Sequence, residues 1–407
     1  MSQTLSKKCR FSIDDKVYHL AIADSIEDVS SDWPVHVKNP FLSPDYLRCV
    51  ESAPPYNMAF AYAIVFRDDI PQVIYYFQAV HFNAAKSLSP QLSEAKSKRS
   101  FSTYFKQKVK HAIARNIDFL TMVNGNLLLT GENGFESLMT CSNEHLEQIH
   151  AAVFEKAESY LESVLHRQVS VLLIKENYSQ NRLLKLSKKE FGLYEFCIEP
   201  NFSFNVPPEW TSLDDYKQSL RAKYRIRANR AEKKKRPIYS QELNADDILR
   251  HKERLYDLYL SIADNAGFNM AVIHKDYLHR LKADWGQQFR LIAFMDNDQV
   301  IGFYSYFLFE DKLVAHFVGF EKSLVVRHQL YLNMLLELID TAITHKVSRI
   351  NLGRTANEIK SSVGAVPTQM YCYIKHKKST FQKIVPGLID YLQPQDEWQL
   401  RHPFKKQ

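Results

Sequence analysis

The sequence has 407 residues, of which 45% are apolar and 13% aromatic. A chain of this length is too long for one ordinary core, and its apolar content excludes a disordered protein. We therefore expect two globular domains of about 200 residues each. The net charge of +7 is concentrated in residues 221–236, where nine Lys or Arg stand against one Glu. A local cationic segment of this kind indicates an anionic partner.

The sequence lacks the motifs that are typical of several classes of protein. The five cysteines form no C-x-x-C pair, so we expect neither a disulfide framework nor a metal site. The longest apolar run, residues 58–66, is far shorter than the roughly 20 residues of a membrane-spanning helix, and no secretory signal opens the chain. We expect a protein of the cytoplasm, or one peripheral at the inner face of the membrane. The motifs of dinucleotide binding, P-loops, zinc proteases and serine hydrolases are missing.

The elements predicted in the first half recur in the same order in the second half. Residues 43–51 predict an amphipathic helix, 62–82 two apolar strands joined by a tight turn, and 150–176 a helix that runs into a strand. The corresponding segments of the second half are 274–282, 290–309 and 330–354. A duplicated helix, hairpin, helix and strand predicts a mixed α/β fold. A Pro- and Asn-rich connection near residue 200 divides the predicted domains, 1–199 and 200–407.

The cationic segment is predicted to belong to a helix that begins at a capping box of Ser212 and Asp215 and ends before Pro237. Four of its cations recur at helical spacing and form one ridge: Lys223, Arg227, Arg230 and Lys234. Such a ridge can bind RNA phosphates, a lipid headgroup, a phosphorylated substrate or an acidic carrier protein. The alternative is an ordinary solvated face.

The stretch NLGRTANEIKSSVGAVP, residues 351–367, predicts a strand, a turn at Gly353 and a short helix. Thr355 and Glu358 read as a second capping box, and Gly364 as a left-handed cap. A helix N-terminus directly after a strand, with Arg354 beside it and Lys360 following, predicts an anion-binding site. The alternative is a plain connection between strand and helix.

Arg327 and His328 stand where the loop after an apolar strand, residues 317–320, leads into a long amphipathic helix. An anion can also be met at such a junction, although two polar residues at a helix start are commonly structural. We therefore include Arg327 among the candidate binding residues.

The chain resembles a known family at three segments. Residues 214–236 (DDYKQSLRAKYRIRANRAEKKKR) and 352–365 (LGRTANEIKSSVGA) are similar to segments of the FemABX-like, peptidoglycan-biosynthesis-related branch of the GNAT acyltransferase superfamily. Residues 39–51 resemble the N-terminal start of that group. The resemblance implies tandem GNAT-like lobes, transfer of an acyl or aminoacyl group to an amine acceptor, and a role in peptidoglycan or lipid biosynthesis. The residues that it implicates in binding are Arg354, Lys360, Lys223 and Arg225, to which the spacing arguments add Gly353, Thr355 and Arg227.

The resemblance also implies an acyl donor as co-substrate, with no tightly bound cofactor. Members that use acetyl-CoA carry a glycine-containing loop for the pyrophosphate, whereas the corresponding residues 323–331 (SLVVRHQLY) contain no glycine. This departure from the family pattern argues against ordinary use of CoA. Three donors stay open: acyl-CoA, an acyl-carrier protein or an aminoacyl-tRNA.

Amine acylation requires a group that removes a proton from the amine. His316, in the apolar strand segment LVAHFVGF, and Tyr304 are the candidate catalytic residues, and Tyr306 is a further one. A histidine in such a strand can equally be a satisfied core residue. Three hypotheses stay open: an N-acyltransferase, an aminoacyl-tRNA-dependent ligase acting on a cell-wall precursor, and a non-catalytic module that binds an anionic membrane or RNA.

Overall fold

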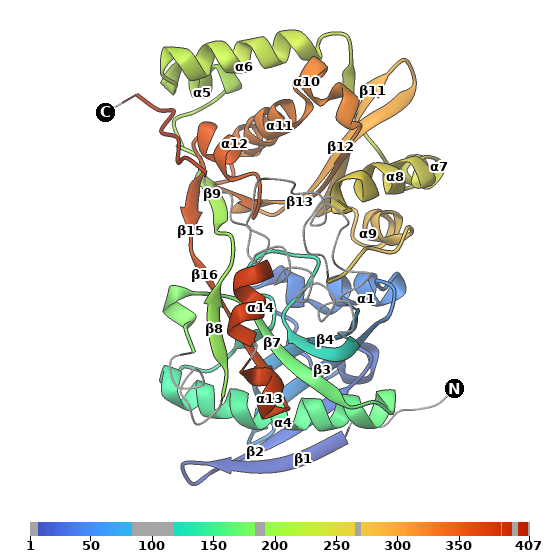
Figure 1. The fold of residues 1–407 in the computed structure, drawn as a ribbon, viewed down its shortest axis with the longest axis vertical. Coiled ribbons are helices and arrows are strands. Elements are labelled where there is room, and N and C mark those ends of the chain that lie inside the picture. Colours follow the sequence, from blue (N-terminus) through green and yellow to red (C-terminus); the bar gives the residue numbers. More distant parts are fainter. Residues whose placement is uncertain are drawn as a thin grey trace, which may run out of the picture. The chain divides into compact units, whose positions relative to one another are not determined.

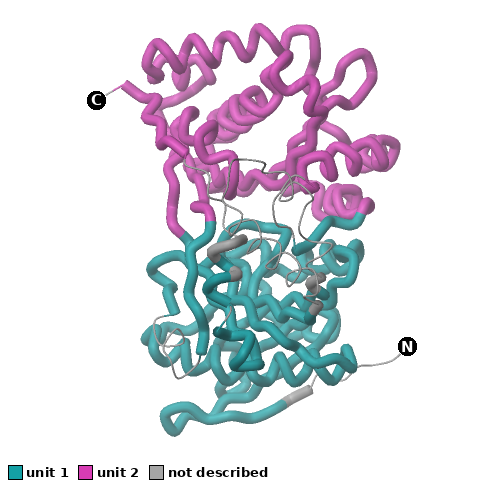
Figure 2. Tube along the Cα trace, in the orientation of Figure 1, with its two compact units in different colours: residues 1–198, 265–274, 370–394 teal, residues 199–264, 275–369, 395–407 magenta. Residues whose placement is uncertain are grey.

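The computed structural model describes residues 7–83, 118–183, 192–264, 270–383, 385–392 and 398–405 (Figure 1). The chain divides into two compact units (Figure 2). Unit 1 comprises residues 1–198, 265–274 and 370–394, and unit 2 comprises residues 199–264, 275–369 and 395–407. Each unit contains one mixed sheet with helices packed on it, which confirms the predicted α/β fold class.

The sheet of unit 1 has the strand order β1-β2-β3-β4-β5-β7-β16-β8, and β6 pairs with β4. The strands are β1 (Lys7–Ile13), β2 (Lys16–Ala23), β3 (Met58–Arg67), β4 (Ile70–Asn83), β5 (Asp118–Asn124), β6 (Phe135–Ser137), β7 (Val169–Tyr178), β8 (Tyr194–Cys197) and β16 (Met370–His376). The helices are α1 (Pro44–Ser52), α4 (Asn143–Leu165), α13 (Ser379–Gln382) and α14 (Val385–Leu392), with short 3-10 turns η1 (Glu27–Val29), η2 (Pro40–Leu42) and η4 (Ser179–Asn181). The core lies between the sheet and α4, where side chains such as Phe77 and Leu161 are fully buried.

The sheet of unit 2 has the order β10-β11-β12-β13-β14-β9-β15. Its strands are β9 (Asn201–Asn205), β10 (Tyr239–Glu242), β11 (Phe289–Asp296), β12 (Gln299–Leu308), β13 (Lys312–Phe320), β14 (Arg349–Gly353) and β15 (Val366–Thr368). Its helices are α5 (Leu213–Ser219), α6 (Ala222–Lys235), α7 (Ala245–Arg250), α8 (Lys252–Ala263), α9 (Tyr277–Asp284), α10 (Val325–His328), α11 (Leu330–Thr344) and α12 (Asn357–Ser362), with the 3-10 turn η5 (Lys322–Leu324). The apolar side of α11 supplies much of the core.

Tight turns of Asp and Asn join the predicted strand pairs. Asp68 and Asp69 between β3 and β4 have φ of 52° and 58°, and Asn297 and Asp298 between β11 and β12 have φ of 46° and 59°. Two successive left-handed residues are typical of the type I′ turn, whose twist matches the flanking strands. The hairpins expected in both halves are therefore confirmed.

The two sheets share one topology. In each, an antiparallel hairpin leads to a strand that pairs in parallel with the next one, and a long helix connects those two: β5, α4 and β7 in unit 1, and β13, α11 and β14 in unit 2. The duplication predicted from the sequence is thus present, and the chain consists of tandem lobes.

The lobes also exchange strands. Beside β7, unit 1 places β16 from the end of the chain, whereas beside β14, unit 2 places β9, which directly follows β8 of unit 1. Each sheet therefore receives one strand from the pair β8 and β9 and one strand from the pair β15 and β16.

Candidate functional site

The stretch 351–367 forms the expected strand, turn and short helix. Gly353, the last residue of β14, has φ of 70°, and its N–H donates to Asn351 Oδ1 at 3.0 Å. At the far end of α12, Gly364 has φ of 103°, and its N–H donates to the carbonyl of Ser361 at 3.0 Å. The Ala365 N–H donates to the carbonyl of Lys360 at 3.2 Å, which completes a Schellman cap.

The predicted capping box of Thr355 and Glu358 is wrong. Thr355 and Ala356 both lie in the left-handed region, with φ of 64° and 51°, so Ala356 becomes the N-cap and no side chain caps α12. Glu358 instead accepts from Arg401 Nε at 3.0 Å. Because α12 has only six residues and no side-chain cap, its N-terminus adds no support to the anion-binding site expected from the sequence, which stays a prediction. Thr355 and Arg354 remain binding candidates without that support.

Lys360 is buried, although a lysine in this position is expected to be exposed. Lys360 is only 3% exposed, and its Nζ donates to the carbonyl of Gly353 at 3.2 Å and to the carbonyl of Arg354. Burial lowers the pKa of Lys360 to about 7, with Glu199 opposing the shift and the Arg354 cation adding to it. The ammonium therefore titrates close to neutral pH at the end of β14.

The basic helix is interrupted, where one continuous helix is predicted. Its capping box at Ser212 and Asp215 is confirmed, but Leu220 leaves the helix, is buried, and forms a bridge with Phe404. This long-range packing overrides the local helical pattern and divides the segment into α5 and α6. Among the predicted cations, Arg227 Nη1 donates to Ser362 Oγ of α12 at 3.1 Å. Lys223 is exposed and Arg225 is half-buried.

Arg327 lies beside the C-terminal end of α6. It is exposed in the short helix α10, where the preceding carbonyl, of Val326, accepts from Lys234 Nζ at 3.1 Å. His328 points inward, with Nδ1 3.0 Å from the Lys234 carbonyl. The structure therefore brings Arg327 together with the cations of α6.

His316 occupies a β-bulge in β13. The pairing between β12 and β13 changes from Tyr306 opposite Ala315 to Tyr304 opposite Val318, so His316 and Phe317 together face Ser305. Ser305 Oγ lies 3.2 Å from His316 Nδ1 and accepts from the Phe317 N–H at 3.1 Å. Burial lowers the pKa of His316 to about 3. Sequence reasoning missed Ser305, although a single serine in the apolar strand β12 was a usable signal.

Tyr304 and His316 do not share a site. Successive strand residues point to opposite faces, and Ser305 contacts His316, so Tyr304 lies on the other face of the sheet. There its hydroxyl donates to Glu337 Oε2 of α11 at 2.7 Å, and burial raises its pKa. Tyr306 stacks against Tyr304 on that same face. The candidate catalytic residues His316 and Tyr304 therefore lie on opposite faces of the sheet, and the catalytic role of each stays a prediction.

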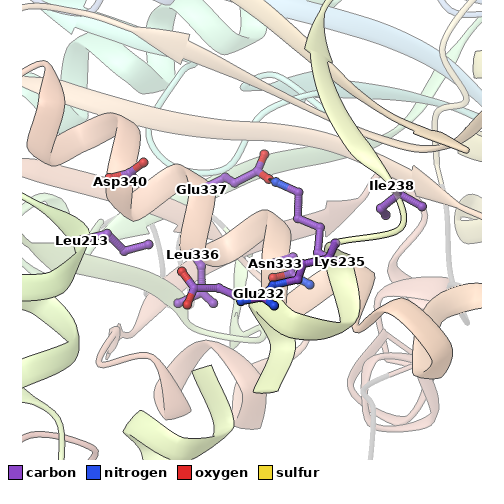
Figure 3. A pocket seen from close by; sticks show the side chains of 9 residues that line it. Leu213, Glu232, Lys235, Ile238, Asn333, Leu336, Glu337 and Asp340 are labelled. Atoms are coloured by element: carbon purple, nitrogen blue, oxygen red, sulfur yellow. Dashed lines mark hydrogen bonds and ion pairs between the residues drawn. The ribbon is translucent and has the colours of Figure 1, made fainter. Parts of the chain in front are cut away.

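A pocket of about 330 Å³ lies on the Tyr304 side of unit 2, between α5, α6 and α11 (Figure 3). Figure 3 shows Lys235 of α6 reaching Glu337 of α11, with which it forms an ion pair. Asp340 and Glu232 also line the pocket. Glu337 accepts from Ser240 Oγ at 2.8 Å as well as from Tyr304, so its carboxylate is held by unit 2 itself. Sequence reasoning did not identify this pocket; the two carboxylates one turn apart on the apolar helix α11 were its only signal.

The parallel strands of unit 2 part after a short contact. β13 and β14 pair only from Lys312 with Arg349 to Val314 with Asn351, and among the described residues no backbone pairing between them continues further. The remaining residues of β13, Ala315–Phe320, contain the bulge and present what we call the open edge. In unit 1, β5 stays paired with β7 to its last residue, Asn124. The open edge is therefore a property of the second lobe.

Neither a metal site nor a membrane span is found in the described part of the chain. Among these residues, no three or more His, Cys, Asp or Glu side chains are grouped to hold a metal ion. Likewise, none of the described helices is long and apolar enough to cross a bilayer.

Residues 218–361 match the family model of the acetyltransferase (GNAT) domain. This range lies in unit 2, except for residues 265–274, which are assigned to unit 1. Unit 1 repeats the topology of unit 2, so the fold is one of tandem GNAT-like lobes, as the resemblance implied. No curated protein matches the sequence significantly.

Similar solved structures include FemX, with 9% identity, a TM-score of 0.49, and coverage of 85% of this chain and 94% of that one. A tandem GNAT protein from the clavulanic acid biosynthesis pathway has 9% identity, a TM-score of 0.47, and coverage of 86% and 91%. The L-PGS structure from Bacillus licheniformis has 11% identity, a TM-score of 0.44, and coverage of 84% and 95%. At these identities and TM-scores, the similarity says nothing about the activity of this protein.

Proposed function

We propose that the protein is an N-acyltransferase of the FemABX-like branch, in which donor and amine acceptor meet at the open edge of unit 2. The observation that carries the proposal is the early parting of β13 from β14, within the lobe that matches the GNAT domain. Beyond Val314 no described strand pairs with this edge of β13, and such an edge offers backbone N–H and C=O groups to an extended, amide-containing ligand, although the Phe320 carbonyl already accepts from Ser261 Oγ. The closed pair of β5 and β7 in unit 1 lacks this feature.

Lys360 is the proposed general base. A neutral lysine has two N–H donors and one lone pair, and its two donors match the two carbonyls that Nζ contacts, of Gly353 and Arg354. The lone pair is then left to accept the proton that the amine loses when its nitrogen attacks the acyl carbonyl carbon. As the C–N bond forms, the bond from that carbon to the sulfur or oxygen of the donor breaks, and the thiol or hydroxyl that leaves takes up a proton. A base whose pKa is near the working pH transfers protons most effectively, which favours Lys360 at about 7 over His316 at about 3. His316 and Ser305 then shape the bulge of the open edge.

The connection from β13 to α11 indicates which part of the acyl donor the protein recognises. Residues 322–328 fold into η5 and α10, and the Leu324 N–H donates to the carbonyl of Glu321 at 3.0 Å. Backbone donors used within these short helices are not free to cradle a pyrophosphate. We therefore propose that the donor is recognised through its acyl-bearing arm, whether that arm belongs to CoA, a carrier protein or an aminoacyl-tRNA.

Mass spectrometry of acylated products tests the proposal. The full chain is incubated with amine acceptors and, in separate reactions, with acyl-CoA, acyl-phosphopantetheine, acyl-carrier protein or aminoacyl-tRNA. We expect an N-acyl product, and acyl-phosphopantetheine should be used as efficiently as acyl-CoA because it lacks only the nucleotide part. A product that requires aminoacyl-tRNA and disappears after RNase treatment would select the ligase reading. Absence of product with every donor would contradict the proposal.

A further inference from the structure

The solvent-facing side of α6 carries cations and one large apolar residue. In Figure 1, α6 is an outer helix of unit 2, packed over α11. Ile226, 57% exposed, stands in the middle of this side, one turn from Lys223 and Arg230. The surface continues onto α10 with Val326, 70% exposed, and Arg327. We call the following residues the cationic face: Lys223, Ile226, Arg227, Arg230, Lys233, Lys234, Arg236, Val326 and Arg327.

No carboxylate of the segment neutralises this face. Within residues 221–236, all of which the structure describes, the single acidic residue is Glu232, and its carboxylate accepts from Lys217 Nζ of α5 at 3.2 Å. On the inner side of α6, Ala228 and Ala231 are buried against the core of unit 2. Arg227 and Lys234 lie at the margin of the face, where they donate to Ser362 Oγ and to the Val326 carbonyl. The other cations share one outward side, where they repel one another unless an anionic partner is present.

We propose that the cationic face binds an anionic lipid surface, with Ile226 and Val326 entering the boundary between headgroups and acyl chains. The 14 residues of α6 extend over roughly 21 Å at 1.5 Å per residue, so a helix lying in the plane of the surface contacts several headgroups at once. Its cations attract the anionic headgroups, and its exposed aliphatic side chains gain from leaving water.

The side chains of the face favour lipid over RNA. Binding to single-stranded nucleic acid commonly adds aromatic platforms on which bases stack. Tyr224 is the one aromatic residue of α6, and it is half-buried against the core of unit 2, away from Ile226. The exposed apolar residues of the face are instead aliphatic, which suits acyl chains.

Sedimentation with vesicles tests this inference on the full chain, without donor or acceptor, so its outcome is separate from that of the acyl-transfer assay. We expect binding to phosphatidylcholine vesicles that contain phosphatidylglycerol, no binding to phosphatidylcholine alone, and weaker binding as salt rises. Ile226→Ser should weaken binding about fivefold by removing apolar contact. Arg230→Gln combined with Lys233→Gln should weaken it about 25-fold, since each cation contributes about fivefold.

Matched controls lie on α7 of the same unit. Leu249 is an exposed aliphatic residue and Arg250 an exposed cation, so Leu249→Ser and Arg250→Gln should leave vesicle binding unchanged. Equal binding to both kinds of vesicle, or full binding by Ile226→Ser, would overturn the inference. Binding to tRNA or to an acidic carrier protein, with no binding to anionic vesicles, would overturn it as well and would assign the face to that partner.

Discussion

The lowered pKa of Lys360, on which its proposed role as the base depends, also affects the stability of the folded protein. Its pKa is about 7 in the folded protein because of burial, against an ordinary value of 10.5, so between these pH values the unfolded chain binds more protons than the folded one. The free energy of unfolding therefore rises with pH across this window. Removing the lysine removes this rise.

Lys360→Met tests that linkage. Between pH 7 and pH 10, the free energy of unfolding of the unmodified protein should increase relative to that of the variant, with a limiting slope of about 1.4 kcal/mol per pH unit in the middle of this window. Urea unfolding at a series of pH values measures the difference. Lys322, an exposed lysine of η5, gives the control: Lys322→Met should follow the unmodified protein. If the free energy of unfolding of Lys360→Met followed the same pH dependence as that of the unmodified protein, Lys360 would not be the source of the rise with pH.

Gly364 is a position at which no residue other than glycine fits without strain. A Cβ there would lie 2.3 Å from Phe404 Cε2, and its φ of 103° is strained for any other residue. We expect Gly364→Ala to lower the free energy of unfolding by about 2–4 kcal/mol. Gly387 in α14 has no atom within 4 Å of such a Cβ, so Gly387→Ala should be neutral or slightly stabilising. Equal stability of the two variants in thermal unfolding would refute this account of Gly364.

The sequence predicted the turn at Gly353 and the left-handed cap at Gly364, because both depend on local backbone conformation. It could not predict that Lys360 is buried, since lysine side chains are seldom buried and the carbonyls that receive Nζ come together only when Gly353 turns the chain. Arg401, which pairs with Glu358, lies more than forty residues away in sequence, beyond the reach of any local pattern.

At the scale of elements, two capping boxes with the same spacing had different outcomes. Ser212 caps α5 through the Asp215 N–H at 3.4 Å, and Asp215 accepts in return from the Ser212 N–H at 3.0 Å. Thr355 instead adopts the left-handed region, which a β-branched residue rarely occupies. The spacing alone predicted both boxes equally well. Strands and hairpins were predicted more reliably, because their apolar runs and Asp or Asn turns are local signals.

These helix starts predict opposite responses to substitution. Ser212→Ala should cost about 1 kcal/mol through loss of the cap. Thr355→Gly should not lower stability, because glycine adopts the left-handed region without strain. Chemical denaturation of both variants measures the two effects. A loss of stability in Thr355→Gly comparable to that in Ser212→Ala would restore the capping role of Thr355.

At the scale of the whole molecule, the duplication was visible in the sequence and the exchange of strands was not. β8 and β9 are consecutive short strands, as are β15 and β16, and nothing in their local patterns says which sheet each one joins. Only the long-range pairing of β16 with β7 and β8 shows that β16 belongs to unit 1.

This exchange predicts that truncation in the second half damages the first lobe. A chain that ends at Gln369 lacks β16, which pairs on both sides within the sheet of unit 1 and contains the buried Met370 and Tyr373. We expect amides of β7 to lose their protection from hydrogen exchange. Deletion of the edge strand β1, which pairs only with β2, should leave β7 protected. Unchanged protection of β7 in the truncated chain would contradict the described pairing.

The central claim is that unit 2 catalyses acyl transfer at the open edge, with Lys360 as the base. Its most direct test is kcat/KM for N-acyl product formation by Lys360→Met and by the α7 control Arg250→Gln, both confirmed to be folded. Loss of a general base costs about 100-fold or more. The account predicts a loss of that size in Lys360→Met, while Arg250→Gln matches the unmodified protein. Product formation by folded Lys360→Met at the unmodified rate would contradict it.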